Sequence, residues 1–455
     1  MTDFQLYALI GLGLYFLLMI AIGIRASKSE THDGFVIGSR DVGLIPTIAS
    51  VASSFRDGAG AVFWVGAGLG AAYGGLWMLV GFSLASLFFV FFGDRVRLIA
   101  KEHNFITIGE VIRYFIGNIT EKTVSIIVLI FALAIITMQL FVSGNIFAKI
   151  LDVDSAIGIA SVASVVGIYM FFGGYSTVIK TDFFQFFIII SLVIFPFFIT
   201  PPKEAMLDFS TFVNVDRDFG LGVFFLGVFY ILSGAETWQR VFSARNAKVV
   251  RIAFPASALF LTIMTLSLIW VGMGTKDMLG DVSENDALFK IFTLTDQIPV
   301  ILLAYFAIVI MTITMSTLDS FCYLFAATLS KNILPERITA KRENYVWLAR
   351  LLIVFTLVLC SFFALTITDF IEFIFSAASL VYILGPVYVL TATGILRKNL
   401  WMDYYVTLAL ISSCGVYIYM FANQMFSNLM MTGVPVFIMI GLLLIALPFQ
   451  GKLKS

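Results

Sequence analysis

The sequence contains little charge for its length. Only 12% of its 455 residues are Asp, Glu, Lys or Arg, whereas 60% are hydrophobic and the mean hydropathy is +1.01; soluble domains carry roughly 25% charged residues. Apolar segments of about 20 residues recur along the whole chain, which is the length that a helix needs to cross a hydrocarbon core. These observations exclude a water-soluble fold and predict an all-α polytopic protein that lies in a lipid bilayer.

Cysteine and histidine are also scarce. Cys322, Cys360 and Cys414 fall in apolar runs without metal or redox spacing, and His32 and His103 sit in polar connections. A metalloenzyme or a membrane protease needs clusters of such ligands, and no nucleophile is paired with a base, so we expect no enzymatic activity. The net charge of zero gives no reason to expect nucleic acid. The chain also lacks a nucleotide-binding motif, so transport driven by ATP is not predicted.

The apolar runs predict thirteen spans. Residues 4–24 lack a basic region and a cleavage site, so they are counted as the first span rather than as a signal peptide. Two long outer connections, 201–218 and 275–296, are expected to be structured caps, and the inner connection 95–120 is expected to hold a short interfacial helix. The predicted spans cover residues 4–24, 45–73, 75–94, 121–148, 155–173, 179–200, 219–241, 250–274, 297–330, 346–367, 370–395, 401–424 and 432–449.

Basic residues indicate the orientation of these spans, because Lys and Arg accumulate in cytoplasmic connections. With the N-terminus outside, most of them fall in inner connections, and one missed span would destroy this asymmetry. We therefore predict a bacterial inner-membrane protein with its N-terminus outside and its C-terminus in the cytoplasm. The inner groups lie at residues 25–40, 95–113, 240–251, 331–342 and 397–454, and Arg240 is counted among them.

Three places inside the spans are too polar for a bilayer, where charged residues mark functional sites by default. The first is the stretch 48–68, in which Arg56 and Asp57 are followed by several glycines. Such a patch is typical of a broken helix, which frees backbone carbonyls for cations. The alternative is that Arg56 and Asp57 neutralise each other and that the glycines serve close helix packing.

The second place is the stretch 173–188, where Asp182 and Gln185 follow a double glycine and Lys180. The alternative here is an interfacial aspartate that pairs with Lys180. The third is the stretch 312–323, where Thr312, Ser316, Asp319, Ser320 and Tyr323 share one helical face beside Thr317. Hydroxyl, carbonyl and carboxylate oxygens are ligands for a hard cation such as sodium, although hydroxyls in membrane helices also bond to their own carbonyls.

These patches, taken in order, resemble the sodium:solute symporter family. The specific pieces are GG-x5-K-T-D-x-x-Q at 173–185, W-Q-R at 238–240 and S-T-L-x-S at 316–320. The resemblance implies the LeuT-type fold, with two inverted repeats of five helices whose first helices are broken. It places an extra helix and loop in residues 1–42, the repeats in 43–201 and 202–396, and two further helices in 397–455.

The resemblance also implies a first sodium site. Its ligands would be backbone carbonyls of the broken second span, at Phe55 and Gly58, and the hydroxyls of Ser316 and Thr317. Some members of the family have a second site, for which Asp182 and Ser320 occupy matching positions. Asp319 stands where a small or hydroxyl residue is usual, so the pair of carboxylates would bind a cation or share a proton. The expected coupling ion is Na⁺, with one or two ions per cycle.

A solute pocket is expected between the broken second span, the fourth span and the broken seventh span. Arg56 would meet a carboxylate and Asp57 an ammonium group of the solute, which favours an amino acid or an organic acid over a sugar. The remaining candidates for solute contact are Gln139, Glu236, Trp238 and Gln239.

The sequence therefore predicts a sodium-coupled symporter that imports a small polar solute by alternating access. Its partners would be this small-molecule solute and the lipid bilayer, and it is expected to act as a monomer. Two alternatives stay open. One is a proton-coupled symporter that uses Asp182 and Asp319, and the other is a transporter-like sensor, although familiar sensors append a signalling domain and this chain ends at Ser455.

Overall fold

The structure is a computed structural model, and it describes residues 1–29, 32–199, 206–339, 342–396 and 398–449. Within these residues every regular element is a helix, and the only β-type pairing is an isolated parallel bridge between Val42 and Ala244. The predicted helix boundaries are close to those observed, because apolar runs of spanning length leave few other conformations for the backbone in a bilayer.

Eleven helical stretches of the described chain are long and apolar enough to span a membrane, and a twelfth is added if one bent pair is counted as a span. The predicted number of thirteen is therefore not confirmed. Thirteen spans are reached only if the bent pair is counted and if α3 (Leu44–Phe55) and α4 (Gly58–Leu69) are halves of one further span. Each of these two helices is too short to cross a membrane alone. The eleven stretches are Asp3–Ala26, Ala72–Glu102, Asn118–Leu151, Ser155–Phe172, Tyr175–Ile199, Ala247–Leu279, Val300–Ile333, Glu343–Ala364, Phe370–Thr393, Leu400–Ala422 and Leu429–Ala446.

Two spans are interrupted, and the sequence explains both breaks. Between α3 and α4, Arg56 and Asp57 leave the helical conformation, and the Asp57 carboxylate caps α4 by accepting from the backbone N–H of Gly60 at 2.5 Å. The second break separates α13 (Arg217–Ser233) from α14 (Ala235–Ser243), which are bent by 47° at Gly234. The broken helix predicted for residues 48–68 is thus present.

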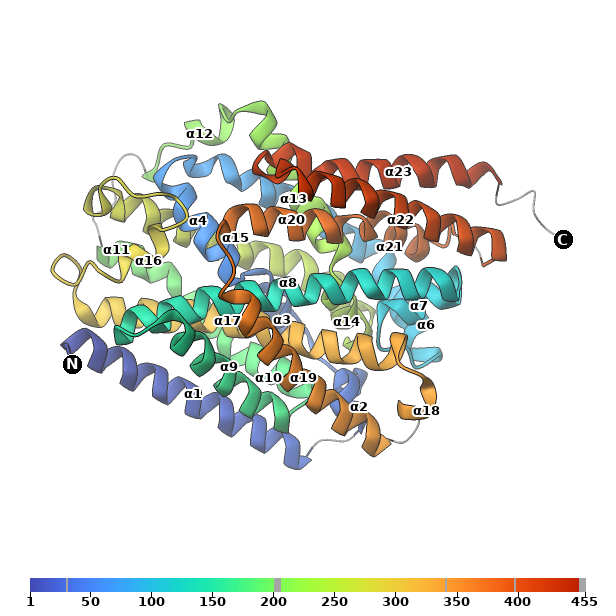
Figure 1. Cartoon of the computed structure of the whole chain (residues 1–455), viewed down its shortest axis with the longest axis horizontal. Coiled ribbons are helices and arrows are strands. Elements are labelled where there is room, and N and C mark those ends of the chain that lie inside the picture. The colour runs from blue at the N-terminus through green and yellow to red at the C-terminus, as the bar shows by residue number, and fades with distance from the viewer. Residues whose placement is uncertain (30–31, 200–205, 340–341, 397, 450–455) are drawn as a thin grey trace.

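The long helix α17 (Val300–Thr328) lies at the centre of the bundle (Figure 1). It packs against α1 (Asp3–Ser29), α8 (Asn118–Leu151), α10 (Tyr175–Ile190) and α19 (Arg342–Ala364), and also contacts α3 and α14. Nearly all of its side chains from Phe306 onward are buried. The polar residues of α17 therefore face protein on every side rather than lipid.

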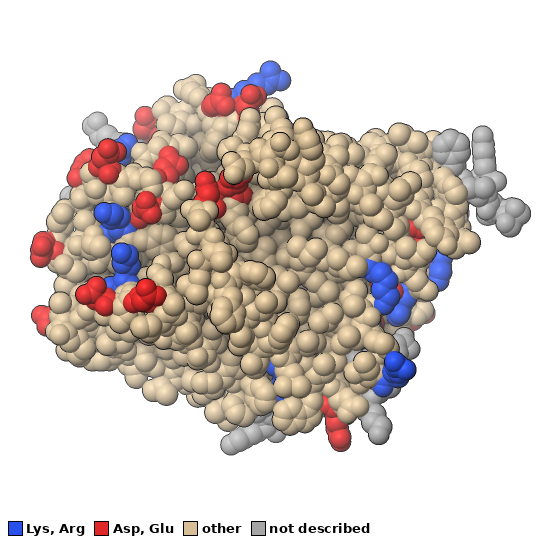
Figure 2. Space-filling model, viewed as in Figure 1, with Lys and Arg blue, Asp and Glu red and all other residues tan. Residues whose placement is uncertain are grey.

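Charged side chains gather at the two ends of the molecule, and on the face shown in Figure 2 an uncharged band separates them. This distribution fits a protein that crosses a bilayer. One basic residue assigned to an inner connection was misplaced: Arg240 lies inside α14 and is only 2% exposed. Within the other predicted inner groups, residues 30, 31, 340, 341, 397 and 450–454 lie outside the described residues.

The described parts of the two long connections that were predicted to be structured caps, 201–218 and 275–296, pack against the helices next to them. In the first, the Tyr73 hydroxyl donates to the carbonyl of Met206, and the Trp77 indole donates to that of Phe212 at 3.0 Å. In the second, Glu284 lies so close to Gly66 and Gly70 that a Cβ at either glycine would meet it. The connection 95–120, which was predicted to be an inner one, holds a short helix, α7 (Ile108–Phe115). The predicted repeat boundary at 201–202 lies outside the described residues.

Candidate functional site

The break between α3 and α4 faces the polar stripe of α17. The Thr317 hydroxyl donates to the carbonyl of Ser54 at 3.4 Å, and the Ser316 hydroxyl donates to Asp182 Oδ1 at 2.6 Å. Both hydroxyls therefore reach across to other helices, whereas that of Thr312 bonds back to the carbonyl of Ile308 at 2.7 Å. Of the residues predicted for the first sodium site, Thr317 thus meets the end of α3 at the break, whereas Ser316 faces Asp182 of α10.

Gly58 and Phe55 lie on either side of this break. A Cβ at Gly58 would meet Thr314 Cγ2 at 2.4 Å and Gln139 Oε1 at 2.8 Å, so only glycine allows α4 to begin this close to α17 and α8. The backbone N–H of Gly58 donates to Gln139 Oε1 at 2.8 Å. Gln139 therefore holds the start of α4 in place.

Arg240 joins four helices beneath this break. Its guanidinium donates to Ser50 Oγ at 2.9 Å and to Ser54 Oγ in α3, to Ser320 Oγ of α17 at 3.1 Å, and to Asp182 Oδ2 of α10 at 3.5 Å. Asp182 has no exposed surface and Arg240 has 2%. Two of the residues predicted for a second sodium site, Asp182 and Ser320, thus bind a guanidinium.

The predicted pairing of Asp182 with Lys180 is not the arrangement found. Lys180 is exposed and Asp182 is fully buried, because residues two positions apart on a helix point in nearly opposite directions. Likewise, Arg56 and Asp57 do not neutralise each other through a direct contact in the described structure. Arg56 donates to the hydroxyl of Thr265 at 2.7 Å and lies 5.7 Å from the centre of the Trp64 ring.

Asp319 has different surroundings from Asp182, although both are buried. Its Oδ2 accepts from the Thr181 hydroxyl at 3.1 Å and from the Tyr169 hydroxyl at 3.3 Å, and its Oδ1 has no hydrogen-bond partner in the described residues. Asp319 and Ser320 are adjacent, so their side chains point about 100° apart around α17. Of the three residues predicted for a second site, Asp182 and Ser320 thus meet at Arg240, whereas Asp319 bonds to Thr181 and Tyr169.

A narrow cavity lies beside the α3–α4 break, with about 60 Å³ of free space, roughly the volume of two water molecules. Arg56 and Asp57 are its only charged lining residues, and the Tyr230 hydroxyl donates to Asp57 Oδ2 at 3.0 Å. The Tyr382 hydroxyl at the same cavity has no partner in the described residues. The walls are mainly aromatic and aliphatic and include Phe55, Phe63, Trp64, Phe131, Ile135, Leu226 and Phe375.

The other predicted solute contacts are not among the residues that line this cavity. Trp238 donates to the carbonyl of Leu232 at 3.2 Å and packs on Phe89, while Gln239 and Glu236 are buried in α14. One oxygen of Glu236 and the amide nitrogens of Gln139 and Gln239 have no hydrogen-bond partner within the described chain. The sequence interpretation missed Tyr230 and Tyr382, and it missed the role of Arg240, whose partners Asp182, Ser50, Ser54 and Ser320 lie far away in sequence.

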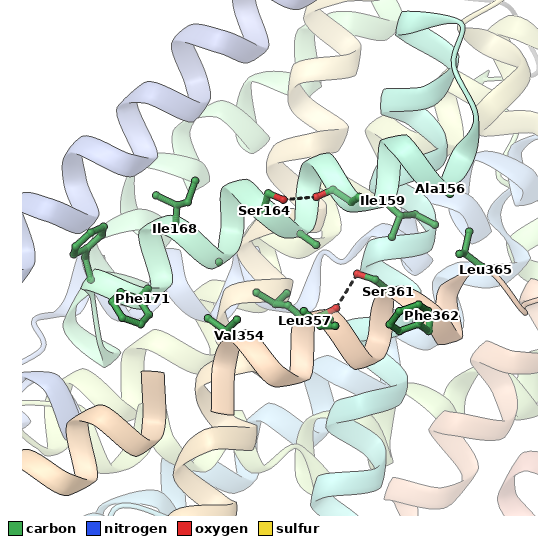
Figure 3. A pocket seen from close by; sticks show the side chains of 15 residues that line it. Ala156, Ile159, Ser164, Ile168, Phe171, Val354, Leu357, Ser361, Phe362 and Leu365 are labelled. Carbon is green, nitrogen blue, oxygen red and sulfur yellow. Dashed lines mark hydrogen bonds between the residues drawn. The ribbon is translucent and has the colours of Figure 1, made fainter. Parts of the chain in front are cut away.

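A larger groove on the outer surface is not a candidate for a polar solute. It runs between α9 (Ser155–Phe172) and α19, and Figure 3 shows its apolar walls, formed by residues such as Ile159, Phe171, Leu357 and Phe362. Its two labelled hydroxyls bond back to their own helices, Ser164 to the carbonyl of Ala160 at 2.7 Å and Ser361 to that of Leu357 at 2.8 Å. The groove therefore offers a solute no free polar group.

Comparisons with known proteins agree with this architecture. A model of the sodium:solute symporter family matches residues 35–201. A sodium/proline symporter of Staphylococcus aureus (strain bovine RF122 / ET3-1) is 30% identical over 208 residues, which are 43% of this chain and 39% of the relative. The matching segment thus spans well under half of that relative's length.

Among solved structures, a Na⁺-coupled sialic acid symporter in a substrate-bound, outward-open state superimposes with a TM-score of 0.77, at 14% identity and over 98% of both chains. A manganese transporter of Eremococcus coleocola superimposes with a TM-score of 0.56, at 14% identity, over 88% of this chain and 93% of the other. These structural neighbours share the fold. They confirm the predicted all-helical membrane protein with a LeuT-type core, and together with the family match they confirm that this chain resembles the sodium:solute symporter family.

Proposed function

We propose that this protein is a sodium-coupled secondary active symporter that imports a small polar solute by alternating access. The observation that carries the proposal is the contact of the Thr317 hydroxyl with a backbone carbonyl at the α3–α4 break, with the Ser316 hydroxyl next to it on α17. A break of this kind supplies backbone carbonyls, here at Phe55 and Gly58, and two hydroxyls complete an oxygen set for a hard monovalent cation. The relatives that match in sequence and in structure are transporters by name.

Coupling follows from the position of this oxygen set. Sodium bound there would hold α3 and α4 against α17 and so fix one wall of the cavity that Arg56 and Asp57 line. If sodium and solute both favour the same conformation, each raises the affinity of the other by an equal factor. An inward sodium gradient then drives solute uptake as the bundle, built from the repeats proposed at 43–201 and 202–396, alternates between its two open states.

The cavity favours a small amphipathic solute, and we propose an amino acid or an organic acid. Arg56 and Asp57 supply one positive and one negative charge at one end, and aromatic rings line the rest. Both side chains already have protein partners, Thr265 for Arg56 and Tyr230 for Asp57, so the solute would have to exchange with them. The protein is proposed to act as a monomer in the bacterial inner membrane, with its N-terminus outside and its C-terminus in the cytoplasm.

A binding screen tests the proposal. Tryptophan fluorescence or calorimetry of the purified protein, with amino acids and small organic acids in sodium and in choline, is expected to find a solute that binds only in sodium. The Ser316→Ala/Thr317→Ala variant should lose at least tenfold in sodium affinity, which equals about 1.4 kcal/mol. The matched control is Ser164→Ala/Ser361→Ala, which removes two hydroxyls that bond only to their own helices.

One observation favours a second candidate, proton coupling. Asp319 is fully buried, and one of its carboxylate oxygens has no partner in the described part of the chain. An isolated buried charge is costly, so such a group tends to hold a proton or a cation. Solute binding that is independent of sodium, follows pH and is abolished by Asp319→Asn would support proton coupling and would contradict the sodium proposal.

A further inference from the structure

We propose that Arg240 is a built-in cation that takes the place of a second sodium ion in this protein. The inference rests on the proposed sodium-coupled function and addresses its stoichiometry. It arises from a disagreement between the residues that the family resemblance assigns to a second site and the partners that these residues have in the structure.

The oxygen atoms of Asp182 and Ser320, two of the three residues of the expected second site, already have protein partners. Asp182 Oδ1 accepts from Ser316 at 2.6 Å, and Oδ2 accepts from Ser50 at 2.5 Å and from Arg240 at 3.5 Å. Ser320 Oγ lies 3.1 Å from the Arg240 guanidinium and 3.3 Å from Ser54 Oγ. A sodium ion there would have to displace the guanidinium from the same oxygens, because both cations use the same lone pairs.

The charge balance leads to the same conclusion. Arg240 and Asp182 form an ion pair in which the two side chains are 3% and 0% exposed. The hydrogen bonds of the other nearby acidic residues go elsewhere: Asp319 accepts from Thr181 and Tyr169, and the Arg240 guanidinium reaches Glu236 at its backbone carbonyl, at 3.0 Å. A second cation beside Asp182 would therefore place another positive charge on the carboxylate that already pairs directly with Arg240.

The anchoring of Arg240 explains how a fixed cation can replace a mobile one. Sodium in such a site would join α10 to α17, and the guanidinium makes this connection through Asp182 and Ser320 and adds α3 through Ser50 and Ser54. It does so from α14, the second half of the other broken span. The planar guanidinium has five donors in a fixed geometry, so it can bind several oxygens at once, as a coordinated metal ion does.

Counting bound sodium tests this proposal without knowledge of the solute. Purified protein is titrated with sodium-22, and we expect wild type to bind one ion per chain. Arg240→Ala, which leaves the oxygens of Asp182, Ser50 and Ser320 in place, should bind two ions. Arg240→Lys retains a cation at this position and should bind one, as should Arg251→Ala, which removes an exposed basic residue of α15 (Ala247–Leu279).

The outcomes separate this inference from the proposed function. If wild type binds no sodium, the proposed function itself fails. If wild type binds two ions, or if Arg240→Ala binds only one, the symporter stands and the built-in cation is rejected. Should Arg240→Ala not fold, the Thr317→Ala variant decides, because it leaves the bond from Ser316 to Asp182 in place: it is expected to bind no sodium, and one ion retained there would place sodium at Asp182 and overturn the proposal.

Discussion

Asp182 and Asp319 lie on facing helices in the same interior, and each has no exposed surface, yet their environments differ. Asp182 has an arginine and two serine hydroxyls as partners. Asp319 has two hydroxyl donors on one oxygen and none on the other within the described residues. Two identical side chains about one helical layer apart thus differ in their surroundings. The charge of Asp182 is neutralised by Arg240, whereas Asp319 has an oxygen free for an ion or a proton.

The largest difference in stability is expected when each aspartate is neutralised in turn. Asp182→Asn should destabilise the protein by about 3 to 5 kcal/mol, because it leaves Arg240 buried without a counter-charge. Asp319→Asn should cost no more than about 1 kcal/mol, because an amide can still accept from Thr181 and Tyr169. Unfolding of the two purified variants in detergent provides the measurement. Equal losses would show that Asp319 also has a charged partner.

Removing both members of the buried pair, Arg240 and Asp182, measures the free energy of their interaction. Arg240→Met alone leaves Asp182 uncompensated, whereas Arg240→Met/Asp182→Leu removes both charges and fills a similar volume. The double variant should be more stable than Arg240→Met, with a coupling energy of about 1 to 3 kcal/mol in a double-mutant cycle. A coupling energy near zero would mean that the two groups do not interact as the structure indicates.

Removing a hydroxyl partner of Asp182 and removing one of Asp319 should differ less in their effects on stability. Ser50→Ala removes a donor to Asp182 and an acceptor for Arg240, so it should cost about 1.5 to 3 kcal/mol. Thr181→Val should cost about 0.5 to 1.5 kcal/mol, because the Thr181 hydroxyl is shared between Asp319 and the carbonyls of Thr177 and Val178. Thermal unfolding of both variants checks the order, and the reverse order would contradict the account.

The smallest effect is expected at an exposed ion pair. Arg245 and Asp41 are 2.5 Å apart, but their side chains are 56% and 66% exposed. Arg245→Ala should change the stability by less than about 1 kcal/mol, and added salt should reduce even this difference. A loss comparable to that of Asp182→Asn, measured in the same buffer, would show that exposure does not decide the strength of these pairs.

The sequence allowed much of this fold to be predicted, for a physical reason. A bilayer permits few backbone conformations, so apolar runs near spanning length locate the helices, and Arg56, Asp57 and the following glycines locate a break. The sequence also placed the hydroxyls of Ser316 and Thr317 on one helix, and in the structure that of Thr317 contacts the break while that of Ser316 contacts Asp182.

The remaining parts of the site depend on directions that periodicity does not provide. Helix α17 is buried all round, so its pattern cannot tell which neighbour Asp319 faces and which Ser320 faces. Arg240 was assigned to a cytoplasmic connection because basic residues are common there, while its real position follows from the bend at Gly234. The side-chain partners of Arg56 and Asp57 belong to α15 and α13, far away in sequence, and no local pattern identifies them.

The central claim, that sodium binding at the α3–α4 break drives solute uptake, is tested most directly in proteoliposomes. The solute selected by the binding screen is supplied in radiolabelled form, with either an inward sodium gradient or an inward proton gradient in choline. We expect the wild-type protein to accumulate the solute with the sodium gradient alone. The Ser316→Ala/Thr317→Ala variant should accumulate none at the same sodium concentration. Accumulation driven by the proton gradient in choline, and retained by this double variant, would contradict the central claim.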